Sequence, residues 1–301
     1  MSLAIKFDQV SKIYPLPGKE SFTALHPLSF QVEPGTIHGL LGPNGAGKST
    51  TISLLGGMLA PNTGTIEICG IDLAKDPVEA KRQLGIVPQE LVIEPVFTVR
   101  EVLYYASGMF GVLPHDRKVR ADELLEALEL TAQADKKARE LSGGMKRRLM
   151  VAKAIMHKPK VLVLDEPTAG VDVALRQRLW ELVRKLHKEG TTILFTTHYL
   201  EEAEQLCEYI TLLHKGKIVK AGTLKALQHE FSGNVLSIEV YDTNQALIEG
   251  GRQNGKTIEL PYEQLDEALM RTSKHYGNNL KTVQNQRVSL EQIFLNLTRE
   301  A

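Results

Sequence analysis

The stretch GPNGAGKST, residues 42–50, decides the fold class of this chain. It follows an apolar run at 37–41 that is typical of a buried strand, and it precedes apolar residues at helical spacing. Its three glycines permit a tight loop whose backbone N–H groups converge on phosphate oxygens, and the helix that follows directs its positive end at the same anion. In such a loop Lys48 reaches the β- and γ-phosphates and the Ser49 hydroxyl coordinates Mg²⁺. The sequence therefore predicts a loop that binds the phosphates of a nucleoside triphosphate.

A phosphate loop needs a carboxylate for the metal, and VLVLDEP at 161–167 supplies one. Its first four residues predict a buried strand, and Asp165 lies at the carboxyl end of that strand, where parallel sheets bind ligands. We expect Asp165 to hold Mg²⁺ through water and Glu166 to polarise the attacking water. The alternative is that Asp-Glu-Pro merely ends a strand in a turn.

A second glycine-containing helix start lies in LSGGM, residues 141–145. Ser142 is a candidate N-cap, and Gly143 and Gly144 leave backbone N–H groups open to an anion. One nucleotide cannot occupy both this site and the phosphate loop, about a hundred residues away in the sequence, unless the two come from different copies. Residues 136–160 hold nine Lys and Arg against one acidic residue, and we assign most of this surplus to a solvated helix face.

Composition limits the classes of protein that remain. A chain of 301 residues is long enough for about two domains, and 43% apolar and 24% charged residues are typical of a folded globular protein. A formal net charge of zero argues against a broadly basic nucleic-acid-binding protein. Cys69 and Cys207 are too few for a disulfide framework or a metal cluster. We expect neither a signal peptide nor a membrane span.

Up to residue 222, short β-branched runs alternate with helical patterns, which favours a largely parallel sheet covered by helices. The expected strands are 3–10, 23–32, 36–41, 64–69, 84–88, 161–165, 191–196 and 209–214. Expected helices at 98–110, 116–130 and 142–157 form an inserted helical subdomain at about 90–160.

After residue 222 the sequence changes character, with polar stretches that contain several glycines. We expect strands at 236–241 and 256–260, a helix near 262–275, and a final helix in SLEQIFLNLT, where Ser289 and Gln292 have the spacing of a capping box. The predicted organisation is therefore a main domain at 1–222 and a small α+β extension at 223–301.

Taken together, the motifs over residues 3–222 resemble those of the nucleotide-binding subunit of an ABC transporter. GPNGAGKST resembles the Walker A motif, LSGGM the ABC signature and VLVLDE the Walker B motif. Gln89 in GIVPQ matches the Q-loop glutamine, Asp172 in AGVD the D-loop, and His198 in FTTH the switch histidine. By itself a glutamine after proline is typical of a surface turn, and a histidine that ends a strand is typical of a structural role. Their order within the set favours the family roles.

The resemblance implies a fold and a role for each motif residue. The fold is an α/β P-loop NTPase of the ABC type, with a mixed-sheet core, the helical subdomain and the α+β extension. Tyr14 takes the place of the aromatic residue that stacks on adenine, although the turn that follows it, at 15–22, is longer than usual. Hydrolysis is expected to depend on Glu166, His198 and Gln89, and Mg²⁺ to be held by Ser49, Gln89 and Asp165. The expected ATP contacts are Tyr14, Gly42, Pro43, Asn44, Gly45, Ala46, Gly47, Lys48, Ser49, Thr50, Ser142, Gly143, Gly144 and Asp172.

The resemblance also implies partners. Two ATPase subunits, expected as a homodimer, pair head-to-tail around two ATP and drive a separate transmembrane permease. LSGGMKRRL, FTVRE at 97–101 and the final SLEQIFLNLT are similar to the ATPases of type-2 export systems. The expected location is the cytoplasmic face of the cell membrane, as a peripheral subunit, and no nucleic acid is expected as a partner.

Two other functions are weighed against this one. A soluble ABC ATPase that acts on ribosomes or nucleic acid usually has two sets of motifs or a long inserted coiled coil, and this sequence has one set and no sustained heptads. A small-molecule kinase would leave LSGGM without a purpose. An exporter ATPase is therefore the preferred prediction.

Overall fold

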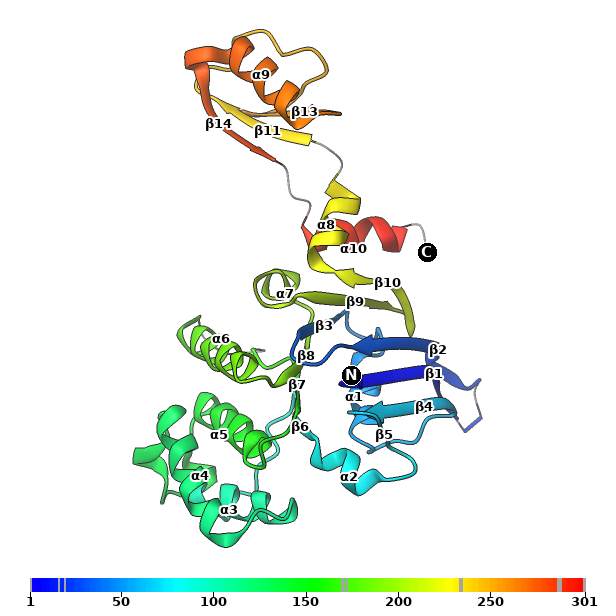
Figure 1. The fold of residues 1–301 in the computed structure, drawn as a ribbon, viewed down its shortest axis with the longest axis vertical. Coiled ribbons are helices and arrows are strands. Elements are labelled where there is room, and N and C mark those ends of the chain that lie inside the picture. Colours follow the sequence, from blue (N-terminus) through cyan, green and yellow to red (C-terminus); the bar gives the residue numbers. More distant parts are fainter. Residues whose placement is uncertain are drawn as a thin grey trace. The chain divides into compact units, whose positions relative to one another are not determined.

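The computed structural model describes residues 2–15, 17–18, 20–168, 171, 173–232, 235–285 and 289–299. The chain folds into two compact units, Met1–Gly222 and Thr223–Ala301 (Figure 1). Each unit has its own buried apolar core.

A six-stranded sheet with the order β10-β9-β3-β8-β7-β6 forms the centre of the first unit. Its strands are β3 (Ile37–Leu41), β6 (Leu84–Val87), β7 (Val161–Asp165), β8 (Thr192–Thr197), β9 (Tyr209–His214) and β10 (Lys217–Thr223). The neighbours from β9 to β6 pair in parallel. Every residue of β3, β7 and β8 is buried, as is usual for parallel strands covered on both faces.

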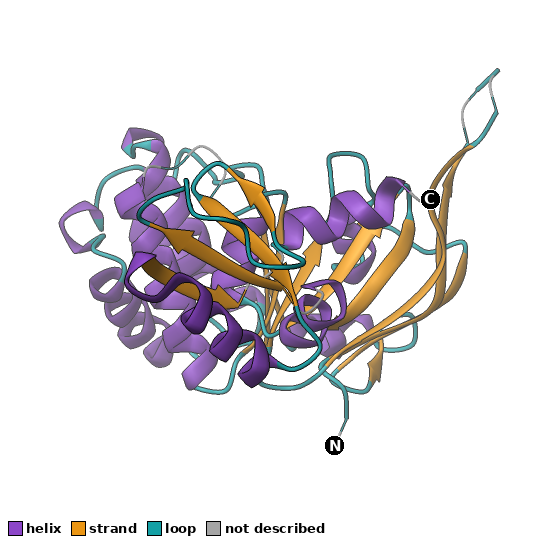
Figure 2. Cartoon of the chain, turned by 90° about the horizontal axis from the view of Figure 1, so that it is seen from above, coloured by secondary structure: helices purple, strands orange, loops and turns teal. Residues whose placement is uncertain are grey.

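A separate antiparallel sheet has the order β2-β1-β4-β5. Its strands are β1 (Ile5–Tyr14), β2 (Phe22–Val32), β4 (Thr63–Ile68) and β5 (Ile71–Asp72). The prediction of one largely parallel sheet is therefore wrong for the strands expected at 3–10, 23–32 and 64–69. β1 and β2 run side by side as a hairpin (Figure 2), because the chain between them is too short for the crossover of a dozen or more residues that parallel pairing needs.

Helices of the first unit belong to two groups. α1 (Lys48–Leu55), α2 (Pro77–Arg82), α6 (Val173–Lys188) and α7 (Leu200–Leu206) connect the strands, and α3 (Val99–Met109), α4 (Pro114–Ala127) and α5 (Gly143–Ile155) gather beside β6 and β7 (Figure 1). The helix expected at 116–130 is confirmed as α4, which buries Ala121, Leu124 and Leu125.

The interior of the first unit includes the only tryptophan of the chain. Trp180 of α6 is buried, and its ring packs edge-on against Phe195 of β8, with ring centroids 5.2 Å apart and an interplanar angle of 87°. This aromatic pair joins α6 to the strand that ends at Thr197.

The second unit contains α8 (Leu224–Ser232), β11 (Val235–Val240), β12 (Arg252–Asn254), β13 (Thr257–Pro261), α9 (Leu265–Tyr276), β14 (Leu280–Asn285) and α10 (Leu290–Arg299). Its antiparallel sheet has the order β12-β13-β11-β14. The predicted strands and the predicted helix near 262–275 are confirmed, whereas β12, β14 and α8 were not predicted because their sequences are polar or short. The predicted capping box is confirmed: Ser289 Oγ accepts from the Gln292 N–H at 3.3 Å, and Gln292 Oε1 accepts from the Ser289 N–H at 3.2 Å.

Candidate functional site

The register of the parallel strands aligns the ends of three of them. Leu41 of β3 pairs with Thr197 of β8, and Asp165 of β7 pairs with Thr196 of β8. The segments that follow these strands therefore leave from one edge of the sheet, the edge at which parallel sheets bind ligands. They contain the phosphate loop, Glu166 and His198.

The phosphate loop curls around its own lysine. The Lys48 ammonium donates to the carbonyl oxygens of Gly42 at 2.8 Å and Pro43 at 3.2 Å, and the side chain is only 5% exposed. A Cβ on Gly42 would lie 2.2 Å from the Leu213 carbonyl oxygen, so this position has no room for another residue. Gly47 has φ 109° and caps α1, which begins at Lys48. The loop is therefore fixed by the strands beside it.

A hollow lies over the loop. It is lined by Phe22, Ala24, Asn44, Gly45, Gly47, Lys48, Ser49, Thr50, Gln89 and Glu166. Six of these residues belong to GPNGAGKST, and Gln89 and Glu166 come from two other predicted motifs. The structure thus brings together the residues expected to meet the phosphates.

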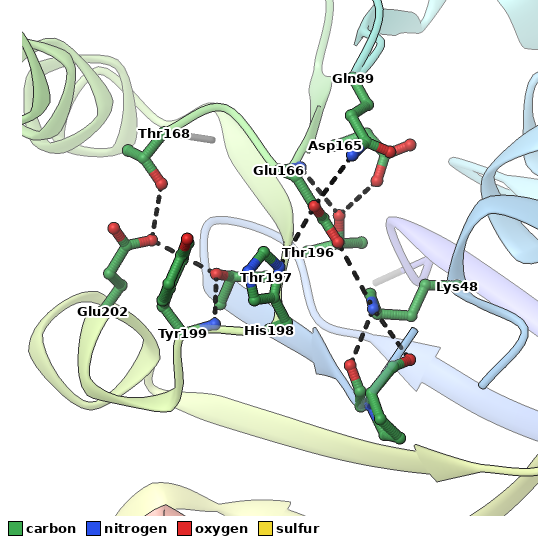
Figure 3. A network of polar contacts seen from close by, with 12 residues as sticks. Lys48, Gln89, Asp165, Glu166, Thr168, Thr196, Thr197, His198, Tyr199 and Glu202 are labelled. Carbon is green, nitrogen blue, oxygen red and sulfur yellow. Dashed lines mark hydrogen bonds and ion pairs between the residues drawn. The ribbon is translucent and has the colours of Figure 1, made fainter. Parts of the chain in front are cut away.

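Glu166 is the meeting point of this group (Figure 3). Gln89 Nε2 donates to Glu166 Oε2 at 3.1 Å, and Lys48 Nζ lies 3.5 Å from Oε1. His198 Nδ1 lies 3.2 Å from Oε2 but has no hydrogen-bond partner among the described residues. Glu166 is 7% exposed and Lys48 is 5% exposed, so the acid and the ammonium interact where little water reaches them. The His198 side chain is 32% exposed and Gln89 is exposed, so these two groups approach the carboxylate from the solvent side.

The backbone of Glu166 has φ 44°, an uncommon value for a residue with a side chain. Its N–H donates to Thr196 O and to Thr196 Oγ1, each at 3.1 Å. These bonds hold the turn that directs the carboxylate toward the loop. Strained backbone of this kind is concentrated at functional sites.

Asp165 is bound by the same threonine. Thr196 Oγ1 donates to Asp165 Oδ1 at 2.6 Å, and Asp165 is 6% exposed. Burial raises the pKa of the Asp165 carboxyl, and the Thr196 hydrogen bond opposes that rise. Thr196 was not predicted as a site residue, because a threonine inside an apolar strand has no distinguishing signal in the sequence.

The oxygen donors near the loop fit a hard cation. Mg²⁺ prefers carboxylate, amide and hydroxyl oxygens and usually binds through few protein ligands together with phosphates. Ser49, Gln89 and Asp165 offer these three kinds of oxygen, and the first two line the hollow. Within the described residues there is no group of three or more His, Cys, Asp or Glu that could hold a metal ion.

The signature segment has a different environment. Ser142 caps α5, since its Oγ accepts from the Met145 N–H at 3.3 Å, as predicted. Ser142 and Gly143 are exposed, and neither they nor Gly144 line the hollow over the phosphate loop. Arg147 of α5 is an exception to the solvated face predicted for most of the basic residues at 136–160. It is buried and donates to the carbonyl oxygens of Pro88 at 2.8 Å and Gln89 at 3.0 Å.

Tyr14, the predicted adenine contact, is not brought into this group. Tyr14 does not line the hollow, and its ring lies under the Lys12 ammonium at 5.5 Å. The aromatic side chain that does line it is Phe22, the cross-strand partner of Tyr14, which is 54% exposed. Asp172 lies outside the described residues.

The fold and this edge define a phosphate-loop nucleoside triphosphatase. Residues 25–169 match the ABC transporter family. The linearmycin resistance ATP-binding protein LnrL of Bacillus subtilis (strain 168) is 35% identical to this chain over 309 residues, which cover 98% of each chain. The Nod factor export ATP-binding protein I of Paraburkholderia xenovorans (strain LB400) is 44% identical over 262 residues, or 85% of this chain and 84% of that protein.

Solved structures agree. An ATP-binding subunit of an ABC transporter matches with a TM-score of 0.69 and 30% identity, covering 76% of this chain and 93% of the other. A dimeric post-hydrolysis ATP-binding cassette bound to ADP and Pi matches with a TM-score of 0.68 and 27% identity, covering 73% and 98%.

The chain belongs to the ABC transporter family and is an ATP-binding, ATP-hydrolysing subunit of such a transporter. The predicted fold class and function are confirmed, and these relatives do not favour the soluble alternative. None of the helices in the described part of the chain is long and apolar enough to cross a membrane.

Proposed function

We propose that Glu166 is the general base for ATP hydrolysis and that Lys48, Gln89 and His198 prepare it. The observation that supports this most is the convergence of all three on one buried carboxylate. In this proposal Glu166 polarises the attacking water, Lys48 binds the β- and γ-phosphates, and Gln89 and His198 respond to the γ-phosphate.

Mg²⁺ is proposed as the metal, held by Ser49, Gln89 and Asp165, and it would neutralise charge on the phosphates. Asp165 must be ionised for this role, which the Thr196 hydrogen bond favours. Tyr14 and Phe22, paired across β1 and β2, are proposed to supply the aromatic surface for adenine.

The second ATP contact is proposed to come from another copy of the chain. Ser142, Gly143 and Gly144 present an exposed helix start outside the hollow, which supports a head-to-tail homodimer around two ATP. The D-loop residue Asp172 would lie at the same interface.

The permease contact is proposed to lie on the helical subdomain, near Gln89. Several large apolar side chains are exposed in and just before the helices of this subdomain. They are Leu91, Val92, Val96, Tyr105, Met109 and Leu113. Exposed apolar surface of this kind is typical of protein interfaces. The proposed partner is a cytoplasmic helix of a separate transmembrane permease, so the subunit would sit on the cytoplasmic face of the cell membrane. The export and resistance names of the relatives support outward transport.

Affinity capture tests this assembly. Tagged Glu166→Gln protein, with ATP and Mg²⁺ to hold the dimer closed, is recovered from detergent-solubilised native cells and its partners are identified by mass spectrometry. A stoichiometric polytopic membrane protein is the expected result. A second bait that also carries Met109→Glu tests the docking surface, because Met109 is 87% exposed and its replacement is expected to leave ATP binding unchanged.

Loss of the membrane protein from the Met109→Glu bait, with ATP binding retained, would support the proposed docking surface. Recovery of ribosomal proteins or nucleic acid without a membrane protein would instead overturn the permease partner.

A further inference from the structure

A buried acid that belongs to none of the nucleotide motifs contacts the segments that carry Glu166 and His198. Glu202 is in α7 and is 5% exposed, although α7 also has the exposed acid Glu201. A carboxylate is seldom buried unless other groups pair with it. The reason for its burial is therefore found in its contacts.

Three segments meet on the Glu202 carboxylate, and Figure 3 shows the contacts with two of them, through Thr168 and Thr197. Thr168 Oγ1 donates to Glu202 Oε2 at 2.8 Å, and Thr197 Oγ1 donates to the same oxygen at 3.3 Å. The other oxygen, Oε1, lies 3.3 Å from Arg176 Nε in α6, as an ion pair. Glu202 thus joins α7 to the segment after β7, to the end of β8 and to α6.

Two of these contacts are adjacent to proposed catalytic residues. Thr168 follows Glu166 by two residues, and Thr197 directly precedes His198. Thr197 Oγ1 also accepts from the Tyr199 N–H at 2.9 Å. The Thr197 hydroxyl therefore links the residue before His198 to the residue after it.

His198 depends on this backbone for its position. Its Nδ1 has no hydrogen-bond partner among the described residues, and its ring rests on Tyr199 with centroids 4.0 Å apart. The 3.2 Å separation from Glu166 is therefore set by the two strand ends that carry the residues. Glu202 binds both ends, at Thr168 just after β7 and at Thr197, the last residue of β8.

We infer that Glu202 is a positioning residue for hydrolysis, which fixes the spacing between Glu166 and His198 and, through Arg176, ties that spacing to the position of α6. The inference rests on the roles proposed above for Glu166 and His198. A residue that only stabilised the fold would change the unfolding midpoint without a specific effect on turnover.

Two variants separate the parts of this contact. Glu202→Gln keeps an oxygen that accepts from the threonines and removes the charge that pairs with Arg176. Thr168→Val removes one hydroxyl from a buried position with little change in shape. Glu201→Gln is the matched control, because it removes an exposed charge from the same helix.

The measurement is steady-state ATP hydrolysis by the full chain with Mg²⁺, alongside thermal unfolding. Glu202→Gln and Thr168→Val are each expected to lower kcat about tenfold while KM for ATP changes less than about twofold. Glu201→Gln is expected to leave both unchanged. A full kcat in both Glu202→Gln and Thr168→Val would overturn the inference.

A double-mutant cycle with His198→Ala distinguishes positioning from general damage. If Glu202 acts through His198, Glu202→Gln has no further effect on kcat once His198 is alanine. The same tenfold loss in both backgrounds would overturn the inference. If His198→Ala itself leaves kcat unchanged, the role proposed for His198 is wrong and the inference falls with it. Loss of turnover in His198→Ala, with full turnover in both positioning variants, would overturn the inference alone.

Discussion

Two glycine-rich segments start helices in the first unit, and they differ in what surrounds them. In the phosphate loop, Ala46 and Lys48 are buried, and a Cβ on Gly42 would meet the Leu213 carbonyl oxygen at 2.2 Å. In the signature segment, a Cβ on Gly143 would have no atom within 4 Å, and the residue is exposed. The fold itself demands glycine at position 42 and leaves space for a side chain at position 143.

Glycine therefore occurs at the two helix starts for two different reasons. The phosphate loop is completed by its own chain, through the Lys48 bonds and the contact with Glu166. At Gly143 only a group from outside the chain can require the absence of a side chain, which is the expectation for phosphates bound by a second copy.

The largest expected effect concerns the phosphate-loop site, which is complete in one chain. Glu166→Gln removes the proposed base and is expected to lower kcat about a thousandfold. ATP binding is retained, because Lys48 and the loop are unchanged, and the closed dimer accumulates. Steady-state hydrolysis and size-exclusion chromatography with ATP measure both effects.

Glu189→Gln, which alters an exposed acid just after α6, is the control and is expected to turn over normally. Full turnover in Glu166→Gln would show that another group acts as the base.

The second prediction concerns the exposed signature segment. Gly143→Asp places a negative charge where the partner's phosphates are proposed to bind, and like charges at an interface cost several kcal/mol. ATP-driven dimerisation is expected to weaken about a hundredfold or more, while nucleotide binding and the unfolding midpoint of the single chain stay the same. Light scattering with and without ATP, together with thermal unfolding, checks this.

An alanine pair sharpens the contrast. Gly143→Ala is expected to fold normally because its Cβ has open space, whereas Gly42→Ala is expected to distort the phosphate loop and abolish ATP binding. Normal ATP binding by Gly42→Ala would remove the difference on which the comparison rests.

The third prediction concerns the strand that leads into the phosphate loop. His38 of β3 is buried, its Nε2 is 2.8 Å from Thr211 Oγ1, and burial lowers its pKa from 6.5 to about 4. Between these two pH values His38 is protonated in the unfolded chain and neutral in the folded chain. The free energy of unfolding therefore decreases as the pH falls through this range, by about 3 kcal/mol from this residue when the pH reaches about 4.

Urea unfolding at several pH values measures this effect. His38→Gln is expected to reduce the decrease in the free energy of unfolding between pH 6.5 and 4 by about 3 kcal/mol. An unchanged slope in that variant would assign the acid sensitivity to other groups.

The smallest expected effect concerns the base of the nucleotide. Phe22→Ala is expected to weaken ATP binding about tenfold, because stacking of a base on an aromatic ring contributes about 1–3 kcal/mol. Binding of inorganic triphosphate, which has no base, is expected to stay the same. Tyr14→Ala, measured in parallel by calorimetry, shows which of the paired rings matters more, and an effect of Phe22→Ala on both ligands would contradict a contact with the base.

The sequence was most informative where chemistry follows from neighbours along the chain. The phosphate loop, Asp165 and Glu166 were predicted from the residues next to them, because a buried strand precedes each motif, and the strand ends meet as parallel pairing requires. The cap at Ser142 was found for the same reason.

Residues that act across long sequence separations were missed. Thr196, Arg147 and Glu202 bind groups that lie 31, 59 and 34 residues away in the sequence, and nothing near them in the sequence marks these contacts. The antiparallel sheet was also missed, because strand pairing depends on the length of the connections rather than on the composition of the strands.

The edge-on pair of Trp180 and Phe195 gives this protein an intrinsic fluorophore in a useful place. Because the chain has one tryptophan, its emission comes from a single buried indole, without any label. Phe195 lies on the strand that leads to Thr196 and His198, and Trp180 lies on α6, the helix that Arg176 connects to Glu202. Excitation at the red edge of indole absorption avoids adenine, so a stopped-flow trace after mixing with ATP would record movement of α6 against β8 as it happens.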